Sequence, residues 1–343
     1  MTNELEIEHI VEKMDEFVPK KDVTKELSEH IARLEYGDLP CDVVFSVKVA
    51  LLDTIGQMFF GATARSSRKI INYVRAIGGR HEATCIYYGD RTNIYNAALA
   101  NGAFCSGLEL PNTSKPERSF GNVVAPAALA TCEREMANGH ELITSLALGL
   151  EATLRLASAA PNLPARRPLN PISTFGPFGA AIAAGKILRM DSFGLENAIS
   201  CCPAQAAGTM QGSFDGSESE RLVSGFASSY GLKAAGMARR SVSGARNMLE
   251  GKAGFFMCIS GLNRDGTPKF NIDRVNEGFG EKWRLRDSFS SDLQSAQATC
   301  KRLLVQAGMP EERSQTVTEI VRNLEDADDV TRLLSDLVAR GGQ

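Results

Sequence analysis

Apolar residues recur at helical spacing along most of this chain. Near its start, six of them follow the i, i+3, i+4, i+7 spacing of an amphipathic helix: Ile7, Ile10, Val11, Met14, Phe17 and Val18. Pro19 and the charged run 20–22 are expected to end that helix. A second helix is predicted from Thr24, and a third from Val43 to Phe60, where Gly61 closes it.

Segments rich in alanine and glycine continue the helical pattern. The stretch 96–108 suits close packing between helices, because small side chains let two backbones approach. Further helices are predicted at 124–137, 140–160, 176–188, 195–209 and 222–239, and a charged pair at 293–308 and 311–339. The best strand candidate, Thr84–Tyr88, is short. The pattern therefore predicts an all-α fold.

Three polar segments interrupt the helices. Residues 109–122 hold two prolines and mixed charges, and residues 161–174 hold four prolines with Arg166 and Arg167 side by side. A third insert, 212–221, has the sequence GSFDGSESER. Loops of this length in a compact helical domain often carry function, although a solvated connector is an equally good interpretation of any one of them.

Charge and hydropathy limit the class of partner. The formal net charge is −3, so there is no basic excess to attract nucleic acid. The opening sequence MTNELEIEHIVEKMDEF lacks the basic and apolar regions of a signal peptide, and no apolar run is expected to span a membrane. We therefore expect a cytoplasmic protein with no nucleic-acid or membrane partner.

The cysteines and histidines give no metal-binding pattern. Eight cysteines are scattered without a C-x-x-C pair, and none of the four histidines lies near a cysteine in sequence. No glycine-rich segment has the spacing of a phosphate-binding loop. We expect no metal site, no disulfide and no cofactor. Cys105 stands apart because it directly precedes the first polar loop.

Five segments, in order, resemble the MmgE/PrpD family, which includes 2-methylcitrate dehydratases, cis-aconitate decarboxylases and an iminodisuccinate epimerase. They are the opening helices with LLDTIG (27–62), the NGA helix (96–103), TFGPFGAAIAA (174–184), the DGS…RL..G loop (215–225) and LEGKAGF (249–255). The resemblance spans roughly residues 24–290. It implies the family's helical domain and a homodimer.

The resemblance also implies a domain plan. Residues 1–22 form an extra N-terminal helix, 23–260 the helical core, 261–294 a remnant of the family's α/β lid, and 295–343 C-terminal helices that return to the core. Family members place a full lid where this chain runs almost directly from the FGEKW segment (279–283) into its last helices. A lid excludes water from an active site, so its loss predicts a wider, wetter cleft.

The residues that carry the family's chemistry are replaced here. The family's H-x-x-D-x-D-D-T-x-H pattern falls on the loop after Ser106, where its aspartate becomes Glu109, its threonine is kept as Thr113 and its second histidine becomes Lys115. A later catalytic histidine becomes Ser119, the histidine of the second loop becomes Asn170, and the substrate-binding lysine becomes Glu220, whereas Arg221 is retained. Imidazole is the side chain suited to moving protons near neutral pH, so histidine-based dehydration or decarboxylation is not supported. Carboxylates facing a tricarboxylate would repel it, which excludes citrate-like substrates.

The main hypothesis is an acid–base enzyme of isomerase, dehydratase or cyclase type, acting on a small to medium neutral or cationic metabolite, as in specialised metabolism. Glu109 and Glu220 would be its acid and base, with Lys115, Arg118 or Arg221 as an electrostatic partner. Substrate contacts are assigned to seven further residues: Thr113, Ser119, Asn170, Arg221, Cys105, Arg167 and Tyr230. Within this set, Cys105 or Ser119 could serve as a nucleophile.

Two alternatives stay open. Loss of the imidazoles and of the lid also suits a non-catalytic binding or scaffold protein that keeps the dimeric helical fold. An amino-dicarboxylate epimerase is the third possibility, but it requires cationic groups that this chain lacks in part.

Overall fold

The computed structural model is a bundle of helices with one small β-hairpin. It describes residues 13, 16–20, 22–106, 116–161, 163, 167–289 and 292–339. The principal helices are α2 (Val23–Arg33), α3 (Cys41–Gly61), α4 (Arg65–Ile77), α5 (Ile94–Cys105), α6 (Gly121–Glu135), α7 (Gly139–Ala159), α9 (Pro171–Ile187), α10 (Ser192–Cys201), α12 (Leu222–Ala238), α15 (Leu293–Gln306) and α16 (Glu311–Arg322). The predicted all-α fold is confirmed.

Short elements connect these helices. The shorter α-helices are α11 (Gln211–Asp215), α13 (Phe255–Ser260), α14 (Leu285–Ser288) and α17 (Thr331–Asp336). The 3₁₀ turns are η1 (Tyr36–Asp38), η2 (Pro116–Phe120), η3 (Cys202–Ala204), η4 (Glu218–Arg221), η5 (Ile272–Val275) and η6 (Leu324–Asp326). Two strands, β1 (Ala83–Thr84) and β2 (Arg91–Thr92), pair antiparallel.

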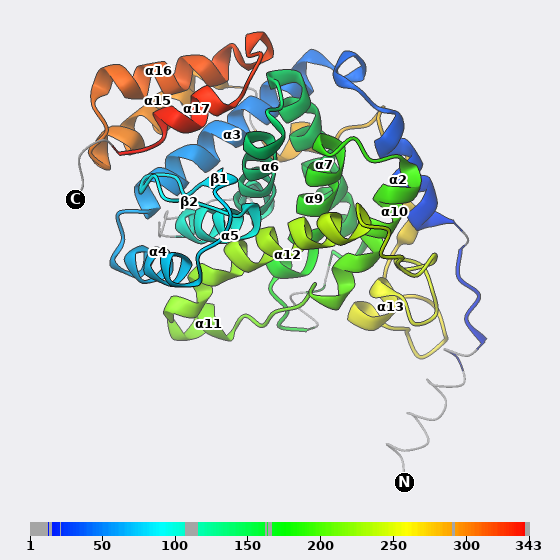
Figure 1. Ribbon diagram of the computed structural model, residues 1–343. Helices are drawn as coiled ribbons and strands as arrows, with labels where there is room; N and C mark the ends of the chain where they lie inside the picture. The colour runs from blue at the N-terminus through cyan, green and yellow to red at the C-terminus, as the bar shows by residue number, and fades with distance from the viewer. Residues whose placement is uncertain are drawn as a thin grey trace.

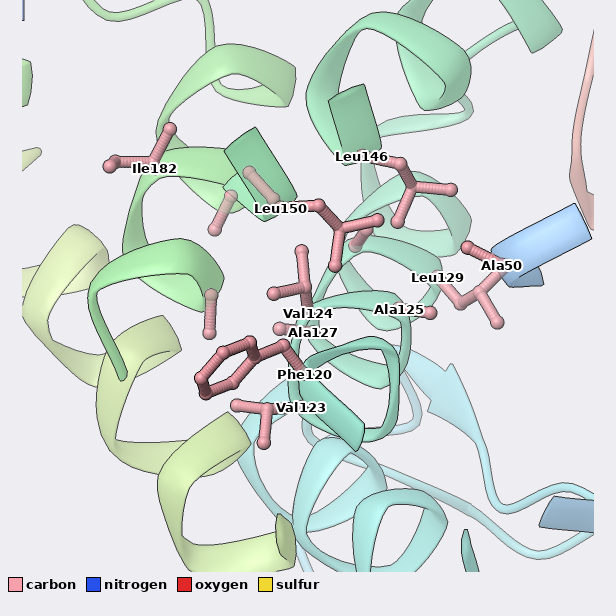
Figure 2. Close-up of a cluster of buried hydrophobic side chains, with 14 of the residues drawn as sticks. Ala50, Phe120, Val123, Val124, Ala125, Ala127, Leu129, Leu146, Leu150 and Ile182 are labelled. Atoms are coloured by element: carbon pink, nitrogen blue, oxygen red, sulfur yellow. The ribbon is translucent and has the colours of Figure 1, made fainter. Parts of the chain in front are cut away.

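Helices α5, α6, α7, α9 and α12 form the centre of the molecule, where α12 crosses α5 and α9 (Figure 1). Around α6 the core is filled by aliphatic side chains from several helices, among them Val124, Leu129, Leu150 and Ile182 (Figure 2). Helices α5, α6, α7 and α9 are apolar on nearly every side because they are covered on nearly every side, whereas α12 keeps an exposed face with Phe226 and Met237.

Two glycines allow α12 to lie unusually close to its neighbours. A Cβ atom at Gly225 would fall 2.3 Å from the backbone oxygen of Leu99 in α5. At Gly231 it would fall 2.2 Å from the backbone oxygen of Pro177 in α9. Neither contact admits a larger residue without movement of a helix, so the backbone of α12 is fixed on both sides.

In the described part of the chain, two helices are long enough and apolar enough to cross a membrane. This differs from the expectation, drawn from the sequence, that no apolar run has that length. These helices are α3 and α7, and 78% and 89% of their most apolar windows are buried inside the fold. Core helices of a globular protein have this property, because apolar residues on every face are needed where every face is covered.

The segment between α13 and α15 is held by a buried ion pair. Arg155 Nε lies 2.6 Å from Glu151 Oε1, one turn earlier on α7, and both side chains are almost fully buried. The Arg155 guanidinium donates to the backbone oxygens of Glu277, at 2.8 Å, and Gly278, at 3.2 Å. Glu151 accepts from the backbone N–H of Leu285 at 3.0 Å. Residues 261–294, the predicted lid remnant, are thus packed on α7 over their described part.

The last helices pack against the body of the fold, where α15 lies along α3 (Figure 1). Lys48 of α3 is 2% exposed and donates to the backbone oxygen of Arg322 at 2.5 Å and to the Glu325 carboxylate. At the other end of the chain, most of the predicted helix at 1–22 lies outside the described residues. Phe17 packs against the core.

Candidate functional site

A cavity of about 240 Å³ opens where the start of α9, the loop before α11, η4 and the first turns of α12 meet. We call it the Glu220 cavity. Its described lining residues are Ser173, Gln205, Ala207, Gly208, Thr209, Gly212, Ser219, Glu220, Leu222, Val223, Phe226, Ala227 and Tyr230. Apolar surface predominates, and none of these residues is a lysine, arginine or histidine.

The start of α9 is fixed by Asn170. Its Oδ1 accepts a hydrogen bond from the backbone N–H of Ile172 at 2.9 Å, which caps the helix. Its backbone oxygen accepts from the Ser173 hydroxyl at 3.1 Å, and its backbone N–H donates to the oxygen of Gly208 at 2.9 Å. Asn170 is buried, so it supports the cavity wall from behind.

The loop 205–210 lies against the start of α9 because Gly208 permits it. Gly208 has φ +151°, and a Cβ atom there would fall 2.3 Å from Ser173 Oγ. An isolated antiparallel bridge joins Leu169 to Thr209 just beside this contact. Together these contacts fix Ser173, Gln205 and Thr209 around one side of the cavity.

Glu220 supplies the acidic group of the cavity. One of its carboxylate oxygens, Oε2, is buried and has no hydrogen-bond partner among the described residues. Gly212 lies beside this oxygen: a Cβ atom there would be 3.4 Å from Oε2, an ordinary contact distance. A buried carboxylate oxygen without a partner is rare in folded proteins and calls for a ligand or a proton.

The turn that carries Glu220 is tied to α4. Lys69 Nζ donates to both carboxylate oxygens of Glu218, at 2.9 and 2.8 Å. The hydrogen bond from Lys69 lowers the pKa of Glu218 below its ordinary value. Both side chains are mostly exposed, so this pair contributes little to stability but links η4 to α4.

Aromatic rings form the outer wall of the cavity. Phe226 and Tyr230, one turn apart on α12, stack with ring centroids 5.6 Å apart. The Lys233 ammonium lies 5.2 Å from the centroid of the Tyr230 ring. Tyr230 lines the cavity, and its expected contact with substrate stays a prediction. Phe226 was not singled out, although its i, i+4 spacing from Tyr230 could have drawn attention to it.

Four other residues predicted to contact substrate are not among the described lining residues of the Glu220 cavity: Arg167, Arg221, Ser119 and Cys105. Arg167 donates to the backbone oxygen of Cys258 at 3.1 Å and does not line the cavity. Arg221 follows Glu220 in η4 but is absent from the described lining, as is the half-buried Ser119 of η2. Cys105 is buried, with Sγ 3.4 Å from the oxygen of Asn101, and burial raises the pKa of its thiol far above the ordinary value. A thiol held protonated in this way is a poor nucleophile.

Three predicted site residues, Glu109, Thr113 and Lys115, lie outside the described residues. Their loop leaves α5 after Ser106, whose Oγ is 3.2 Å from Ser224 Oγ near the start of α12. The convergence of Glu109 and Glu220 therefore stays a prediction. Sequence reasoning also missed Ser173, Gln205 and Thr209, since their place at the cavity depends on the glycine contact at position 208.

Comparison with known proteins gives one family and a consistent set of relatives. Residues 25–266 match the model of the MmgE/PrpD N-terminal domain. A cis-aconitate decarboxylase-like protein, oryM, of Aspergillus oryzae is 27% identical over 278 residues, which are 78% of this chain and 57% of the relative.

Two further relatives are named cis-aconitate decarboxylase. The protein of Aspergillus terreus is 25% identical over 77% of this chain and 55% of its own length, and the human protein is 26% identical over 68% of this chain and 50% of its own. The chain thus spans about half the length of the curated relatives that it matches.

Proposed function

Because this chain belongs to the MmgE/PrpD family, we propose that it is an acid–base enzyme of the dehydratase or isomerase type whose proton-transfer group is Glu220. The observation that supports this proposal best is the buried, unpartnered Oε2 of Glu220 inside a mostly apolar cavity. A carboxylate oxygen that no donor of the protein occupies is available to accept a proton from a bound substrate.

The proposed chemistry follows from the group that is present. The Glu220 carboxylate would remove a proton from a carbon of the substrate and, once protonated, return it to another carbon or to a departing hydroxyl. Ser173, Thr209 and Gln205 would orient the substrate by hydrogen bonds, and the Tyr230 side chain offers a hydroxyl besides its ring. Glu109 is proposed as the second carboxyl, brought by the loop that starts beside Ser224.

The proposed substrate is a small neutral or cationic molecule. The described lining offers a carboxylate and no cationic side chain, so a polyanion would meet repulsion without compensation. Cis-aconitate, named for the relatives, carries three carboxylates and does not fit this lining. A cyclisation reaction is compatible with the same group, because it too needs a proton removed at one atom and supplied at another.

A matched pair of variants tests the role of Glu220. Glu220→Gln removes the base with little change of shape, and Glu218→Gln changes an exposed carboxylate two residues away in the same turn. We expect Glu220→Gln to lower the turnover of a substrate found by metabolite screening about 100-fold or more, and Glu218→Gln to leave it within about threefold. Release of CO₂ from cis-aconitate, unaffected by Glu220→Gln, would refute the proposal.

A non-catalytic binding protein is the second candidate, and one observation favours it. The three histidines in the described part of the chain, His30, His81 and His140, all lie away from the Glu220 cavity. Ligands that raise the melting temperature without being converted by the wild-type chain would support this alternative. An epimerase acting on an amino-dicarboxylate is disfavoured by the same lack of cations that disfavours cis-aconitate.

Two further parts of the proposal concern the whole protein. We propose a homodimer, as the family resemblance implies, and a cytoplasmic location. An apolar groove of about 410 Å³ on α4 and α12, which includes Ile70, Tyr73 and Phe226, is a surface suited to a second copy.

A further inference from the structure

A second cavity, of about 350 Å³, lies between α3, η2 and α15. It shares no described lining residue with the Glu220 cavity. Its described lining residues are Val49, Asp53, Gln57, Arg118, Asp292, Ser295, Ala296, Thr299, Cys300 and Leu303. Neither the family resemblance nor the proposed function assigns a role to it.

Asp53 is a partly buried acid on α3. Its side chain is 23% exposed, and no hydrogen bond to its carboxylate occurs among the described residues. Burial raises the pKa of Asp53, and the nearby charge of Arg118 opposes that rise. Its oxygens are therefore available to a donor that enters the cavity.

Arg118 provides the opposite charge on the same cavity. Its NH1 lies 4.0 Å from Asp53 Oδ2, which is longer than the 2.7–2.9 Å of a charge-assisted hydrogen bond. Its Nε donates to the backbone oxygen of Ser288 at 3.2 Å, which holds the guanidinium in place. The two charges therefore lie side by side with hydrogen-bonding capacity left on each.

Further polar groups complete the wall. Gln57 Oε1 accepts from Nδ2 of Asn122, a residue 7% exposed whose Oδ1 has no partner in the described part of the chain. Ser295 and Thr299 add hydroxyls from α15, whereas Val49, Ala296 and Leu303 give the cavity an apolar side. A ligand here would meet hydrogen-bonding groups on one side and aliphatic carbon on the other.

We propose that this cavity binds a small zwitterion with an ammonium and a carboxylate a few bonds apart, of the amino-acid class. The ammonium would donate to Asp53 and the carboxylate would accept from Arg118, so each charged group gains a hydrogen-bonded partner. A simple cation would leave Arg118 without an acceptor, and a simple anion would approach the carboxylates of Asp53 and Asp292 unfavourably. The side chain of the zwitterion would lie along Val49, Ala296 and Leu303.

Isothermal titration calorimetry on the full chain tests this with three probes of similar size: L-alanine, propionate and ethylammonium. We expect L-alanine to bind at least about tenfold more tightly than either singly charged analogue, because only it satisfies both charged groups. Asp53→Asn and Arg118→Gln should each weaken L-alanine binding about tenfold or more, while Arg118→Lys should keep part of it.

Glu220→Gln is the matched control, since it changes a carboxylate in the other cavity and should leave L-alanine binding unchanged. Each variant is checked by circular dichroism. If Asp53→Asn does not fold, Arg118→Gln together with Thr299→Val carries the test. The proposal fails if L-alanine does not bind at concentrations up to about 20 mM, or if propionate alone binds as tightly as L-alanine. It also fails if the Asp53→Asn and Arg118→Gln variants bind L-alanine as tightly as the wild type. A Glu220→Gln variant that loses binding would place the ligand in the Glu220 cavity instead.

Discussion

Lys48 shows how single residues fix the end of the chain to its beginning. Its ammonium is almost completely buried on α3, a position that is costly unless the charge is paired. Glu325 and the backbone oxygen of Arg322, more than 270 residues away, supply the partners. The pair therefore makes the position of the C-terminal helices depend on two titratable groups.

The pH dependence of this contact can be predicted. Burial alone would raise the pKa of Glu325, but the hydrogen bond from Lys48 brings the pKa below its ordinary value. Its contribution to stability is thus present above the unfolded pKa of about 4.3 and is lost as the pH falls through the lower folded pKa. We expect Glu325→Gln to cost about 1–3 kcal/mol at pH 7 and much less near pH 3.

Urea unfolding of the wild type and of Glu325→Gln, at pH 7 and near pH 3, measures this difference in unfolding free energy. Glu312→Gln, an exposed acid at the start of α16, is the control and should change stability by less than about 0.5 kcal/mol. An equal loss for Glu325→Gln at both pH values would show that its charge is not what matters.

At the scale of elements, local pattern predicts the buried helices well. The predicted helix 222–239 is found as α12, and the predicted helix 140–160 is found as α7. Both segments are rich in small and apolar residues and contain no proline to interrupt the helix. The helix predicted at 195–209 ends at Cys201 in α10, since Pro203 follows and has no backbone N–H to donate. The predicted strand 84–88 is wrong beyond its first residue: Tyr87 and Gly89 adopt positive φ values, and the chain turns back to form the β1–β2 hairpin.

The candidate site was harder to predict than the helices. Glu220 could be found from the sequence because it lies in the polar insert 212–221, which the family resemblance covers. Tyr230 lies close behind this insert, on α12. Ser173 and Thr209 could not, since they meet only through the positive φ at Gly208. The Asp53–Arg118 cavity needs α3 and α15 to pack together, and no local pattern encodes a contact over such a sequence separation.

A further prediction concerns Arg155 and the segment that it holds. Arg155→Met would leave Glu151 as a buried carboxylate without its cation. It would also remove the donors to four backbone oxygens, those of Val275, Glu277, Gly278 and Lys282. We expect a loss of about 3–5 kcal/mol of unfolding free energy, and Glu151→Gln/Arg155→Met should recover part of it. Hydrogen exchange of residues 275–285 should accelerate in the single variant.

Arg286→Met is the matched comparison for Arg155. Arg286 also forms an ion pair, with Asp42 at 2.8 Å, but both side chains are well exposed. Its loss should cost at most about 1 kcal/mol. If the two arginine variants are equally stable, the buried pair does not anchor this segment.

At the scale of the whole molecule, an apolar groove lies open on α4 and α12. Tyr73 is 57% exposed there and Phe226 38%. If a second copy covers this groove, light scattering should give twice the chain mass, and Tyr73→Glu should give a monomer because a buried carboxylate would lack a partner. Phe193→Glu on α10, at a residue 67% exposed, should remain a dimer. A monomeric wild-type chain, or a dimeric Tyr73→Glu variant, would contradict this arrangement.

The glycine contacts of α12 have a consequence for how the Glu220 cavity can adapt. With Gly225 and Gly231 set against the backbones of α5 and α9, one wall of the cavity cannot move without displacing the central helices. Adjustment to a substrate must therefore come from the opposite wall, in residues 211–221, which turn at Gly216 and lie beyond the contacts that fix 205–210. A change of specificity is accordingly accessible through the side chains at Val223, Phe226 and Tyr230, which can vary while their helix stays where it is.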